Sequence, residues 1–248
     1  MTEQSKSFVF GTRAVMEAIH AGQDIDKILI QKNLNSPLIR QLISLARDYK
    51  IPMQRVPVQK LNRYTRKNHQ GVVCLLSAIG YASLDHIISQ AFSEGRSPLV
   101  VLLDRITDVR NLGAIARSAD AAAADALVTP LTGQAQITPE AIKASAGALN
   151  HLPVCRVSKL NTTIKDLQHS GIQVVACTEK AERTMYQADL KIPTAILMGS
   201  ERDGITPALI ASCDQTVKIP MAGNISSLNV SVATALILFE CVRQRLNL

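Results

Sequence analysis

The feature that most constrains the fold is an alternation of short apolar segments with amphipathic ones over residues 99–246. The apolar segments consist largely of Val, Ile, Leu and Ala, a composition typical of strands that are buried on both faces. Parallel strands need a crossover between them, and the amphipathic segments supply it as helices. The alternation therefore predicts an α/β domain whose parallel sheet is covered by helices on both faces. The predicted strands are residues 99–103, 126–129, 153–157, 172–177, 194–198 and 215–219, and the predicted helices are residues 112–124, 138–149, 159–170, 206–212 and 228–246.

A smaller α/β unit precedes this domain. A helical pattern follows Gly11, apolar strands are predicted at 27–31 and 71–78, and a helix is predicted between them at about 36–50. Strands and helices thus alternate here too, as in a compact layered domain.

We place the domain boundary in the mixed sequence between the two units. The N-terminal domain is predicted at 1–79, a linker at 80–97 and the C-terminal domain at 98–248. A possible short helix over 84–92 lies within the linker and can belong to the second domain.

Local signals fix the ends of two of the predicted helices. Thr138 followed by Pro139 and Glu140 is a favourable helix start, because a hydroxyl caps the first turn and proline fits there. Ser158 is predicted to cap the next helix, and Gly171 to end it.

Positive charge is concentrated in the first third of the chain. Residues 1–80 hold 12 Lys and Arg against 5 Asp and Glu, whereas residues 81–248 hold 15 of each. Such an asymmetry indicates an anionic partner for the first part. A basic stretch is also often only a solvated face, so charge alone leaves both interpretations open. The densest stretch contains Arg47, Lys50, Arg55, Lys60, Arg63, Arg66 and Lys67.

Several classes of protein are disfavoured by what the sequence lacks. The five cysteines are scattered without a CxxC pair and the five histidines without a ligand spacing, so we expect idle thiols and no metal site. No signal-peptide layout and no apolar run of membrane-spanning length occur, which favours a soluble cytoplasmic protein. Neither GxGxxG nor GxxxxGK[ST] is present, which disfavours dehydrogenases, phosphate-loop NTPases and the common Rossmann-type methyltransferases.

Three polar, glycine-containing loops follow predicted strands. They cover residues 104–113, 199–204 and 219–231. Ligands of open α/β sheets gather at the carboxyl ends of the strands, where these loops begin. For any single loop a purely structural role is the stronger interpretation: Asn111 can cap a helix, Arg117 can be solvated and Glu201 can balance Arg202. Three such loops at one sheet edge predict a ligand site.

The residues of these loops resemble the SpoU family of RNA ribose methyltransferases. The run Asn111-Leu-Gly113-Ala-Ile-Ala-Arg117 resembles its first motif, and Gly199-Ser-Glu201-Arg-Asp-Gly204 resembles its second. Ile219-Pro-Met221 followed by Ser227-Leu-Asn229-Val-Ser231 resembles the third. The segments Phe10-Gly11-Thr-Arg and His69-Gln70-Gly71-Val72 resemble the branch that modifies a guanosine of large-subunit (23S) rRNA, so the resemblance covers the whole chain.

The resemblance implies a fold, a cofactor and an assembly. Members have a SPOUT-type C-terminal domain with a deep trefoil knot, which periodicity alone would not predict. They bind S-adenosylmethionine largely through backbone groups of the knotted loops, and they work as homodimers with the active site near the subunit interface. Carried onto this chain, the cofactor contacts fall on Met198, Gly199, Ile219, Met221, Ser227 and Leu228.

The resemblance also implies the catalytic residues Asn111, Arg117, Glu201 and Asn229. The reaction is a displacement in which a ribose 2′-oxygen attacks the methyl group of a sulfonium. Because a guanidinium rarely gives up its proton, we assign Arg117 to clamping the phosphate beside the target ribose rather than to acting as a simple base. Glu201 is expected to orient Arg117 or Asn111 by a charge-assisted hydrogen bond.

In related proteins the N-terminal domain recognises RNA, which gives the basic stretch a role. Phosphate contacts are predicted for Arg47, Arg55, Arg63, Arg66 and Lys67. Tyr64 can stack on an unpaired base or simply pack in the domain.

Three alternatives remain. The same chemistry can act on tRNA or on an rRNA adenosine, although the tRNA branch often lacks this N-terminal domain. A non-catalytic RNA-binding or ribosome-assembly factor is disfavoured by the four intact catalytic positions, and a Rossmann-type nucleotide-binding enzyme by the missing fingerprint. One departure from the family pattern is Asn150, where relatives often carry an acid.

Overall fold

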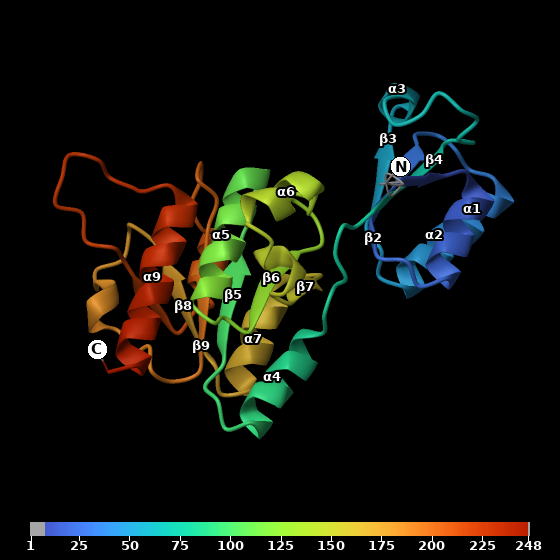
Figure 1. Ribbon diagram of the computed structural model, residues 1–248. Coiled ribbons are helices and arrows are strands. Elements are labelled where there is room, and N and C mark those ends of the chain that lie inside the picture. Colours follow the sequence, from blue (N-terminus) through green and yellow to red (C-terminus); the bar gives the residue numbers. More distant parts are fainter. Residues whose placement is uncertain (1–7, 248) are drawn as a thin grey trace. The chain divides into compact units, whose positions relative to one another are not determined.

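A computed structural model describes residues 8–247 of the chain, which divides into two compact units between Gly80 and Tyr81 (Figure 1). Residues just after the division pack on the second unit. Ala82 donates a backbone hydrogen bond of 2.9 Å to the carbonyl of Val154, and the Arg156 guanidinium lies 3.6 Å from the centroid of the Tyr81 ring. Residues 1–7 and Leu248 lie outside the description. The sequence prediction that the N-terminus lacks a signal-peptide layout falls in part on these residues.

The first unit is a mixed sheet with order β1-β4-β2-β3. Strand β2 pairs parallel with β3, and β4 runs antiparallel to both β1 and β2. The elements are β1 (Phe8–Phe10), α1 (Thr12–His20), β2 (Ile25–Gln31), α2 (Pro37–Asp48), β3 (Met53–Val56), α3 (Val58–Asn62) and β4 (Val72–Leu76).

Both faces of this sheet are covered, because side chains alternate along a strand. Ile28 and Ile30 of β2 point to the face on which α1 and α2 pack. Leu29 points to the other face, where it meets Leu61 of α3 and the partly buried Tyr64. Helices α2 and α3 therefore lie on opposite faces of one sheet.

The second unit is a sheet of six parallel strands with order β10-β8-β9-β5-β6-β7. Its strands are β5 (Leu99–Leu103), β6 (Ala126–Pro130), β7 (Val154–Val157), β8 (Gln173–Cys177), β9 (Thr194–Met198) and β10 (Gln215–Val217). Its helices are α4 (Leu84–Ser93), α5 (Val109–Ala121), α6 (Pro139–Ala144), η1 (Ala148–Asn150), α7 (Leu160–His169), η2 (Met185–Gln187), α8 (Pro207–Ile210) and α9 (Val230–Arg245).

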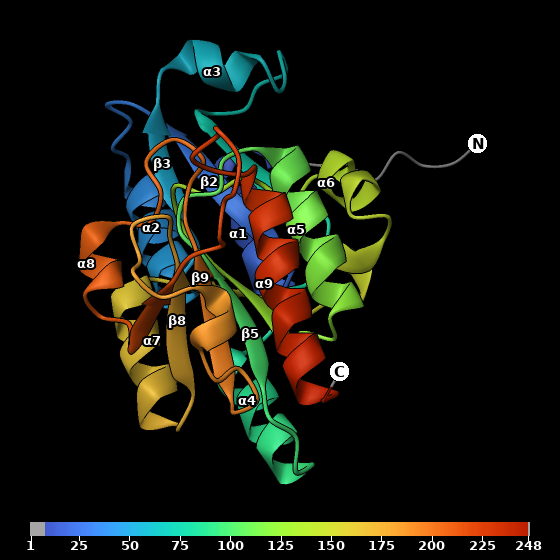
Figure 2. The same ribbon diagram turned by 90° about the vertical axis from the view of Figure 1, so that its left-hand side faces the viewer.

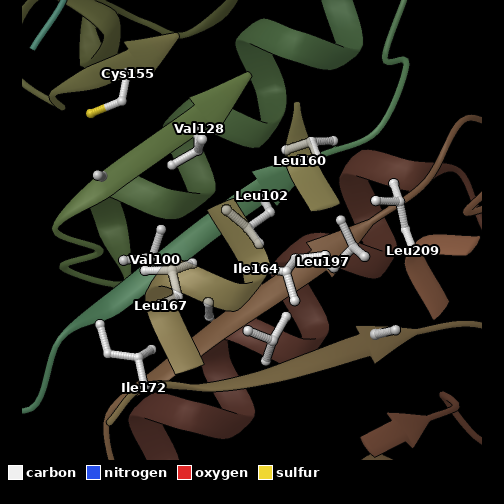
Figure 3. Close-up of a cluster of buried hydrophobic side chains, with 14 of the residues drawn as sticks. Val100, Leu102, Val128, Cys155, Leu160, Ile164, Leu167, Ile172, Leu197 and Leu209 are labelled. Carbon is white, nitrogen blue, oxygen red and sulfur yellow. The ribbon is translucent and has the colours of Figure 1, made fainter. Parts of the chain in front are cut away.

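Helices cover both faces of this sheet. A cluster of buried side chains joins α4, α7 and α8 to one face, with Val100 and Leu102 of β5 at its centre (Figure 3). Helices α5 and α9 lie side by side on the other face (Figure 2). Gly113 allows α5 to approach α6 closely, because a Cβ atom there would lie 2.7 Å from the carbonyl oxygen of Ala141.

The predicted fold class is confirmed: a parallel sheet with helices on both faces follows a smaller α/β unit. The strands at 99–103 and 194–198 have the predicted bounds. Helix α4 occupies most of the segment predicted as a linker, and Ile88 of α4 lies in the core of the second unit. The trefoil knot stays a prediction.

Several local expectations were wrong. The helix predicted at 138–149 is split into α6 and η1, because Ala146 and Gly147 have φ of 51° and 91°. Helix α7 has Lys159 rather than Ser158 at its N-cap, without a side-chain hydrogen bond. The Thr138 cap is confirmed, since its hydroxyl accepts from the Ala141 amide, and Gly171, with φ of 80°, follows the end of α7 as expected.

The cysteines behave as the sequence predicted, since all five are free. Burial raises the pKa of each thiol to about 12, in Cys74, Cys155, Cys177, Cys213 and Cys241 alike. Among residues 8–247 no group of three His, Cys, Asp or Glu side chains is arranged to hold a metal ion. No helix in the same range has the length and apolar character needed to cross a membrane.

Candidate active site

Three predicted catalytic residues from three separate segments of the chain share one hydrogen-bond network. The Oε1 atom of Glu201 accepts from the Nδ2 groups of Asn111 and Asn229, the latter at 2.7 Å. Asn229 Nδ2 also lies 3.1 Å from Asn111 Oδ1. Because their acceptor is a carboxylate, the two bonds to Glu201 are charge-assisted. Of the two partners expected for Glu201, the structure gives it Asn111.

Helix ends hold two of these residues in place. Asp108 caps α5 by accepting from the Arg110 amide at 2.7 Å and the Asn111 amide at 3.3 Å. Asn229 caps α9, with its Oδ1 accepting from the Ser231 amide at 2.9 Å. The cap of α5 is therefore Asp108 and not Asn111, which leaves the Asn111 side chain free to bond Glu201.

A tight hairpin presents Glu201. The amide of Ser200 donates to the carbonyl of Gly204 at 3.1 Å, and the amide of Gly204 donates back at 3.0 Å. Gly199 precedes this pair, and a Cβ atom on it would lie 2.2 Å from the backbone of Gly204 and Ile205. The glycine is thus required by close approach of the backbone within the hairpin.

A cavity of about 530 Å³ lies beside the network, at the carboxyl ends of β8 and β9. Its volume suits a cofactor or drug-sized ligand. Every residue expected to contact the cofactor lines it: Met198, Gly199, Ile219, Met221, Ser227 and Leu228.

The segment from Cys177 to Lys180 also lines this cavity, and the sequence analysis missed it. The signal was available, because this segment follows a predicted strand and therefore reaches the same edge of the sheet as the other loops. The segment contains the polar residues Thr178, Glu179 and Lys180 but no glycine, and it matches no motif. It was therefore not distinguished from an ordinary loop.

A second cavity, of about 570 Å³, adjoins the first. It is lined by Asn111 and by the segment 105–108, and it shares Val230 and the hairpin residues Ser200–Asp203 with the first cavity. Glu201 therefore borders both spaces. A ligand in one cavity and a ligand in the other would therefore both lie against this hairpin.

Arg117 does not join the network. It is exposed on α5, and its side chain has no hydrogen bond or ion pair with any residue between 8 and 247. Six residues separate it from Asn111, which on a helix corresponds to about 9 Å along the axis and about 120° around it. The guanidinium is therefore open to an external anion.

The five basic residues expected to contact RNA do not form one patch. All are exposed, but Arg47 lies on α2 and Arg63, Arg66 and Lys67 follow α3, which covers the opposite face of the sheet. Arg55 donates from Nη1 to the carbonyls of Gln31 at 3.2 Å and Leu34 at 2.6 Å, so it also has a structural task.

The segment 63–68 is held between two fixed ends. His69 is buried: its Nδ1 accepts from the Gly71 amide at 2.9 Å, which leaves Nε2 to donate to Asn62 Oδ1 at 2.9 Å. Gln70 accepts from the Thr12 amide at 3.3 Å, which joins the two N-terminal segments that carried the family resemblance. Tyr64 packs edge-on against Phe8, with ring centroids 6.1 Å apart, so its packing role is realised.

Comparison with known proteins agrees with this geometry. Residues 98–239 match the model of the SpoU rRNA Methylase family, and residues 8–82 match a domain described as RNA 2′-O ribose methyltransferase substrate binding. The chain belongs to the SpoU family.

Relatives match over nearly the whole chain. A protein of Bacillus subtilis, YacO, named for the TrmH family of tRNA/rRNA methyltransferases, is 36% identical over 98% of this chain and 97% of its own. The SpoU methyltransferase AviRb of Streptomyces viridochromogenes, solved with S-adenosylmethionine, is 30% identical over 97% of this chain and 90% of its own, with a TM-score of 0.61. An S-adenosylmethionine-bound rRNA methyltransferase of Sinorhizobium meliloti is 27% identical over 95% and 86%, with a TM-score of 0.59.

The SpoU chain is therefore an RNA 2′-O-ribose methyltransferase that uses S-adenosylmethionine. The residues fit that cofactor: the loops that follow β8, β9 and β10 line the first cavity, and Ile219, Leu228 and Met198 supply apolar surface for an adenine ring.

Substitutions of Asn229 separate its two structural tasks. Asn229→Ser keeps an N-cap oxygen but is too short to reach Glu201, whereas Asn229→Ala removes both contacts. We expect Asn229→Ala to be about 1 kcal/mol less stable than Asn229→Ser, because loss of a capping side chain costs that much. Chemical unfolding of the three proteins measures the difference, and equal stability of the two variants would show that the cap contributes nothing.

Proposed function

We propose that this chain methylates the ribose 2′-hydroxyl of a guanosine in 23S rRNA. The observation that carries the proposal is the Asn111–Glu201–Asn229 network on the hairpin that borders both cavities, in a chain that also carries a substrate-binding domain. A donor in the first cavity and a ribose in the second would meet at these side chains.

An rRNA target is favoured over tRNA by the extent of the similarity. The Sinorhizobium meliloti rRNA methyltransferase matches 95% of this chain, including the first unit. A solved structure described by the 2-OH methylation of C/U34 on tRNA has 99% of its own chain matched but covers only 61% of this one. The additional N-terminal unit is what a larger, structured RNA would require for recognition.

The residues divide the work between donor and acceptor. Met198, Gly199, Ile219, Met221, Ser227 and Leu228 would hold the donor, which supplies a methyl group on a positively charged sulfur. Arg117 clamps the phosphate beside the target ribose, for which its unpaired guanidinium is suited. Asn111, Glu201 and Asn229 form the polar wall that orients the 2′-hydroxyl.

Preorganisation is the contribution of the network to catalysis. Glu201 fixes two amide side chains through one oxygen atom, so their remaining polar atoms keep one direction before the ribose arrives. Holding a nucleophile in an attack geometry lowers the barrier without any new chemical group. The sulfonium and the developing alkoxide lose charge together, so a site that excludes water favours the transition state.

A homodimer is the assembly that fits the surface of α9. Val232, Leu236 and Phe239 are 48%, 40% and 49% exposed, although all three are large and apolar. Their spacing of four and three residues places them on one face of the helix, opposite the side that packs on α5 and the sheet. Burial of this stripe against a second copy would put the interface next to Asn229, at the start of the same helix.

The reaction is tested by transfer of tritium from labelled S-adenosylmethionine to unmodified 23S rRNA, with the product mapped by primer extension sensitive to ribose methylation. We expect one 2′-O-methylguanosine. Arg117→Ala should abolish turnover and leave cofactor affinity nearly unchanged, because Arg117 does not line the first cavity.

Arg110→Ala is the matched control, since Arg110 is another exposed arginine of α5 and its ion pair with Glu140, at 3.8 Å, is weak. Full activity of Arg117→Ala would contradict the proposed role of Arg117 in clamping the phosphate beside the target ribose. Transfer to tRNA but not to rRNA would overturn the substrate, and cofactor binding without any transfer to rRNA, tRNA or an assembly intermediate would support a binding factor instead.

The basic segment is tested by the salt dependence of RNA affinity. Replacing both Arg66 and Lys67 with Ala should weaken binding and lower the slope of log K against log salt by about 1 for each phosphate contact removed. Lys165→Ala, on α7 of the second unit, serves as the control. A slope equal to that of the parent protein would move the RNA contact away from segment 63–68.

The assembly is tested by sedimentation of the parent protein and Phe239→Lys. We expect a dimer that Phe239→Lys converts to monomer, because a charge would have to be buried in the apolar contact. Ile192→Lys, which adds the same charge at an exposed apolar residue outside the stripe, should remain dimeric. A monomeric parent protein at micromolar concentration would refute the homodimer.

A further inference from the structure

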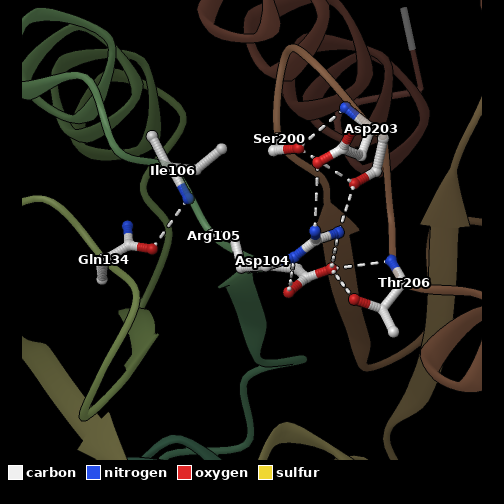
Figure 4. A network of polar contacts seen from close by, with 8 residues as sticks. Asp104, Arg105, Ile106, Gln134, Ser200, Asp203 and Thr206 are labelled. Atoms are coloured by element: carbon white, nitrogen blue, oxygen red, sulfur yellow. Dashed lines mark hydrogen bonds and ion pairs between the residues drawn. The ribbon is translucent and has the colours of Figure 1, made fainter.

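The hairpin that carries Glu201 is anchored at its base by one buried carboxylate, Asp104 (Figure 4). Asp104 follows β5 and is 4% exposed. Its Oδ2 atom accepts from both the amide and the hydroxyl of Thr206, each at 2.7 Å. Its own amide donates to the carbonyl of Met198 at 2.8 Å. Asp104 therefore binds the chain immediately before the hairpin and immediately after it.

Arg105 extends the same anchor toward the tip. Its Nε and Nη2 atoms donate to the two oxygens of Asp104 at 3.1 and 3.2 Å. Nη2 also donates to the carbonyl of Gly204 at 3.1 Å, and Nη1 lies 3.4 Å from Asp203 Oδ2. Arg105 has φ of 58°, in the left-handed region that a non-glycine residue adopts at a cost. The contacts of its guanidinium with Asp104 and the hairpin offset that cost.

The carboxylate is charged in the folded protein. Burial raises the pKa of Asp104, but hydrogen bonds from Arg105 and Thr206 outweigh burial and hold it below its ordinary value. A buried charge with hydrogen bonds on both oxygens has little freedom to move, since any displacement would leave it unpaired. The contacts of Asp104 with Thr206 and Met198 accordingly tie the base of the hairpin to the end of β5.

What Asp104 fixes is the position of Glu201. The Ser200–Gly204 pair, the close approach at Gly199 and a hydrogen bond of 3.1 Å from the Asp203 amide to the Ser200 hydroxyl join the anchored base to the tip that carries Glu201. The hairpin is also the wall that the two cavities share. A shift at its base would move Glu201 relative to Asn111 and Asn229, which belong to other elements.

We propose that Asp104, together with Arg105 and Thr206, is a positioning residue for methyl transfer that acts through Glu201. This inference rests on the proposed function of the site. Asp104 does not line either cavity, so it has no direct contact with donor or ribose.

The chain offers a matched control at the opposite end of the same strand. Asp125 also pairs with an arginine, Arg96, and accepts a backbone hydrogen bond, from Leu99 at 2.8 Å. Leu99 begins β5 and Asp104 follows its end. Asp125→Asn therefore removes an arginine-paired carboxylate that bonds the start of β5, and it leaves the hairpin contacts in place.

The first measurement does not depend on activity. Amide hydrogen exchange, resolved by residue, is compared for the parent protein, Asp104→Asn and Asp125→Asn. We expect exchange of the Gly204 and Thr206 amides to rise at least tenfold in Asp104→Asn and to stay at the parent rate in Asp125→Asn. Unchanged exchange at both amides in Asp104→Asn would overturn the anchor itself.

The second measurement is a double-mutant cycle on the rate of methyl transfer. We expect Asp104→Asn to lower kcat about 10²-fold, the loss that a misplacement of about 1 Å can cause, with less effect on KM for RNA. In a chain that already carries Glu201→Ala, Asp104→Asn should lower kcat no further, because its effect passes through Glu201. Asp125→Asn should keep the parent kcat in both backgrounds.

The outcomes separate the two proposals. Independent, multiplicative losses from Asp104→Asn and Glu201→Ala would show that Asp104 has only a structural role, and overturn the inference. If Glu201→Ala keeps full activity, the proposed role of Glu201 fails as well, whatever the exchange data show.

If Asp104→Asn does not fold, Thr206→Val replaces it. Thr206→Val should lower kcat, and Thr206→Ser, which restores the hydroxyl donor, should recover kcat to within about twofold of the parent. Equal kcat in Thr206→Val and the parent would refute the proposal.

Discussion

The pairing of β5 with β9 is the constraint on which the rest of the site depends. The two strands run parallel and in register, so that Leu103 is opposite Met198 and the chain leaves both strands at the same level of the sheet. Asp104 and Gly199 are therefore neighbours although 95 residues separate them in sequence. A slip of the register would turn every side chain of one strand toward the other face of the sheet, and the buried Val, Ile and Leu residues prevent it. Hydrophobic burial in the sheet thus sets the geometry of the polar site.

Polar contacts then convert this register into a defined loop geometry. Asp104 closes the base of the hairpin, Gly199 permits its backbone to fold tightly, and Glu201 at its tip holds Asn111 and Asn229. The contacts of Asp104 and Glu201 join segments that follow different strands, so the network forms only when β5, β9 and the start of α9 are all in place. This dependence explains why the glycine and asparagine positions of the family motifs are far apart in sequence but act as one unit.

The sequence allowed the fold class and most elements of the second unit to be predicted, because strands buried on both faces produce continuous apolar segments. It was less informative where elements are short. Strand β1 (Phe8–Phe10), strand β3 (Met53–Val56) and helix α3 (Val58–Asn62) were not predicted, since a few residues cannot display a hydrophobic period. The expected cap at Ser158 failed because a capping residue type does not by itself determine where a helix begins: α7 has Lys159 at its N-cap.

By itself the sequence determined the fold class, a parallel α/β sheet. It also determined which residues are available: glycines where the backbone must approach closely, and the motif residues Asn111, Glu201 and Asn229 that identify the family. Only the tertiary structure decided which of them meet. It joined these three side chains, left Arg117 exposed on a different side of α5, placed Arg47 on a face away from Arg63, Arg66 and Lys67, and gave Asp104 its anchoring contacts. The physical reason is that hydrophobic patterning along a chain specifies burial and local geometry, whereas hydrogen bonds between distant loops depend on strand order and register, which no local pattern contains.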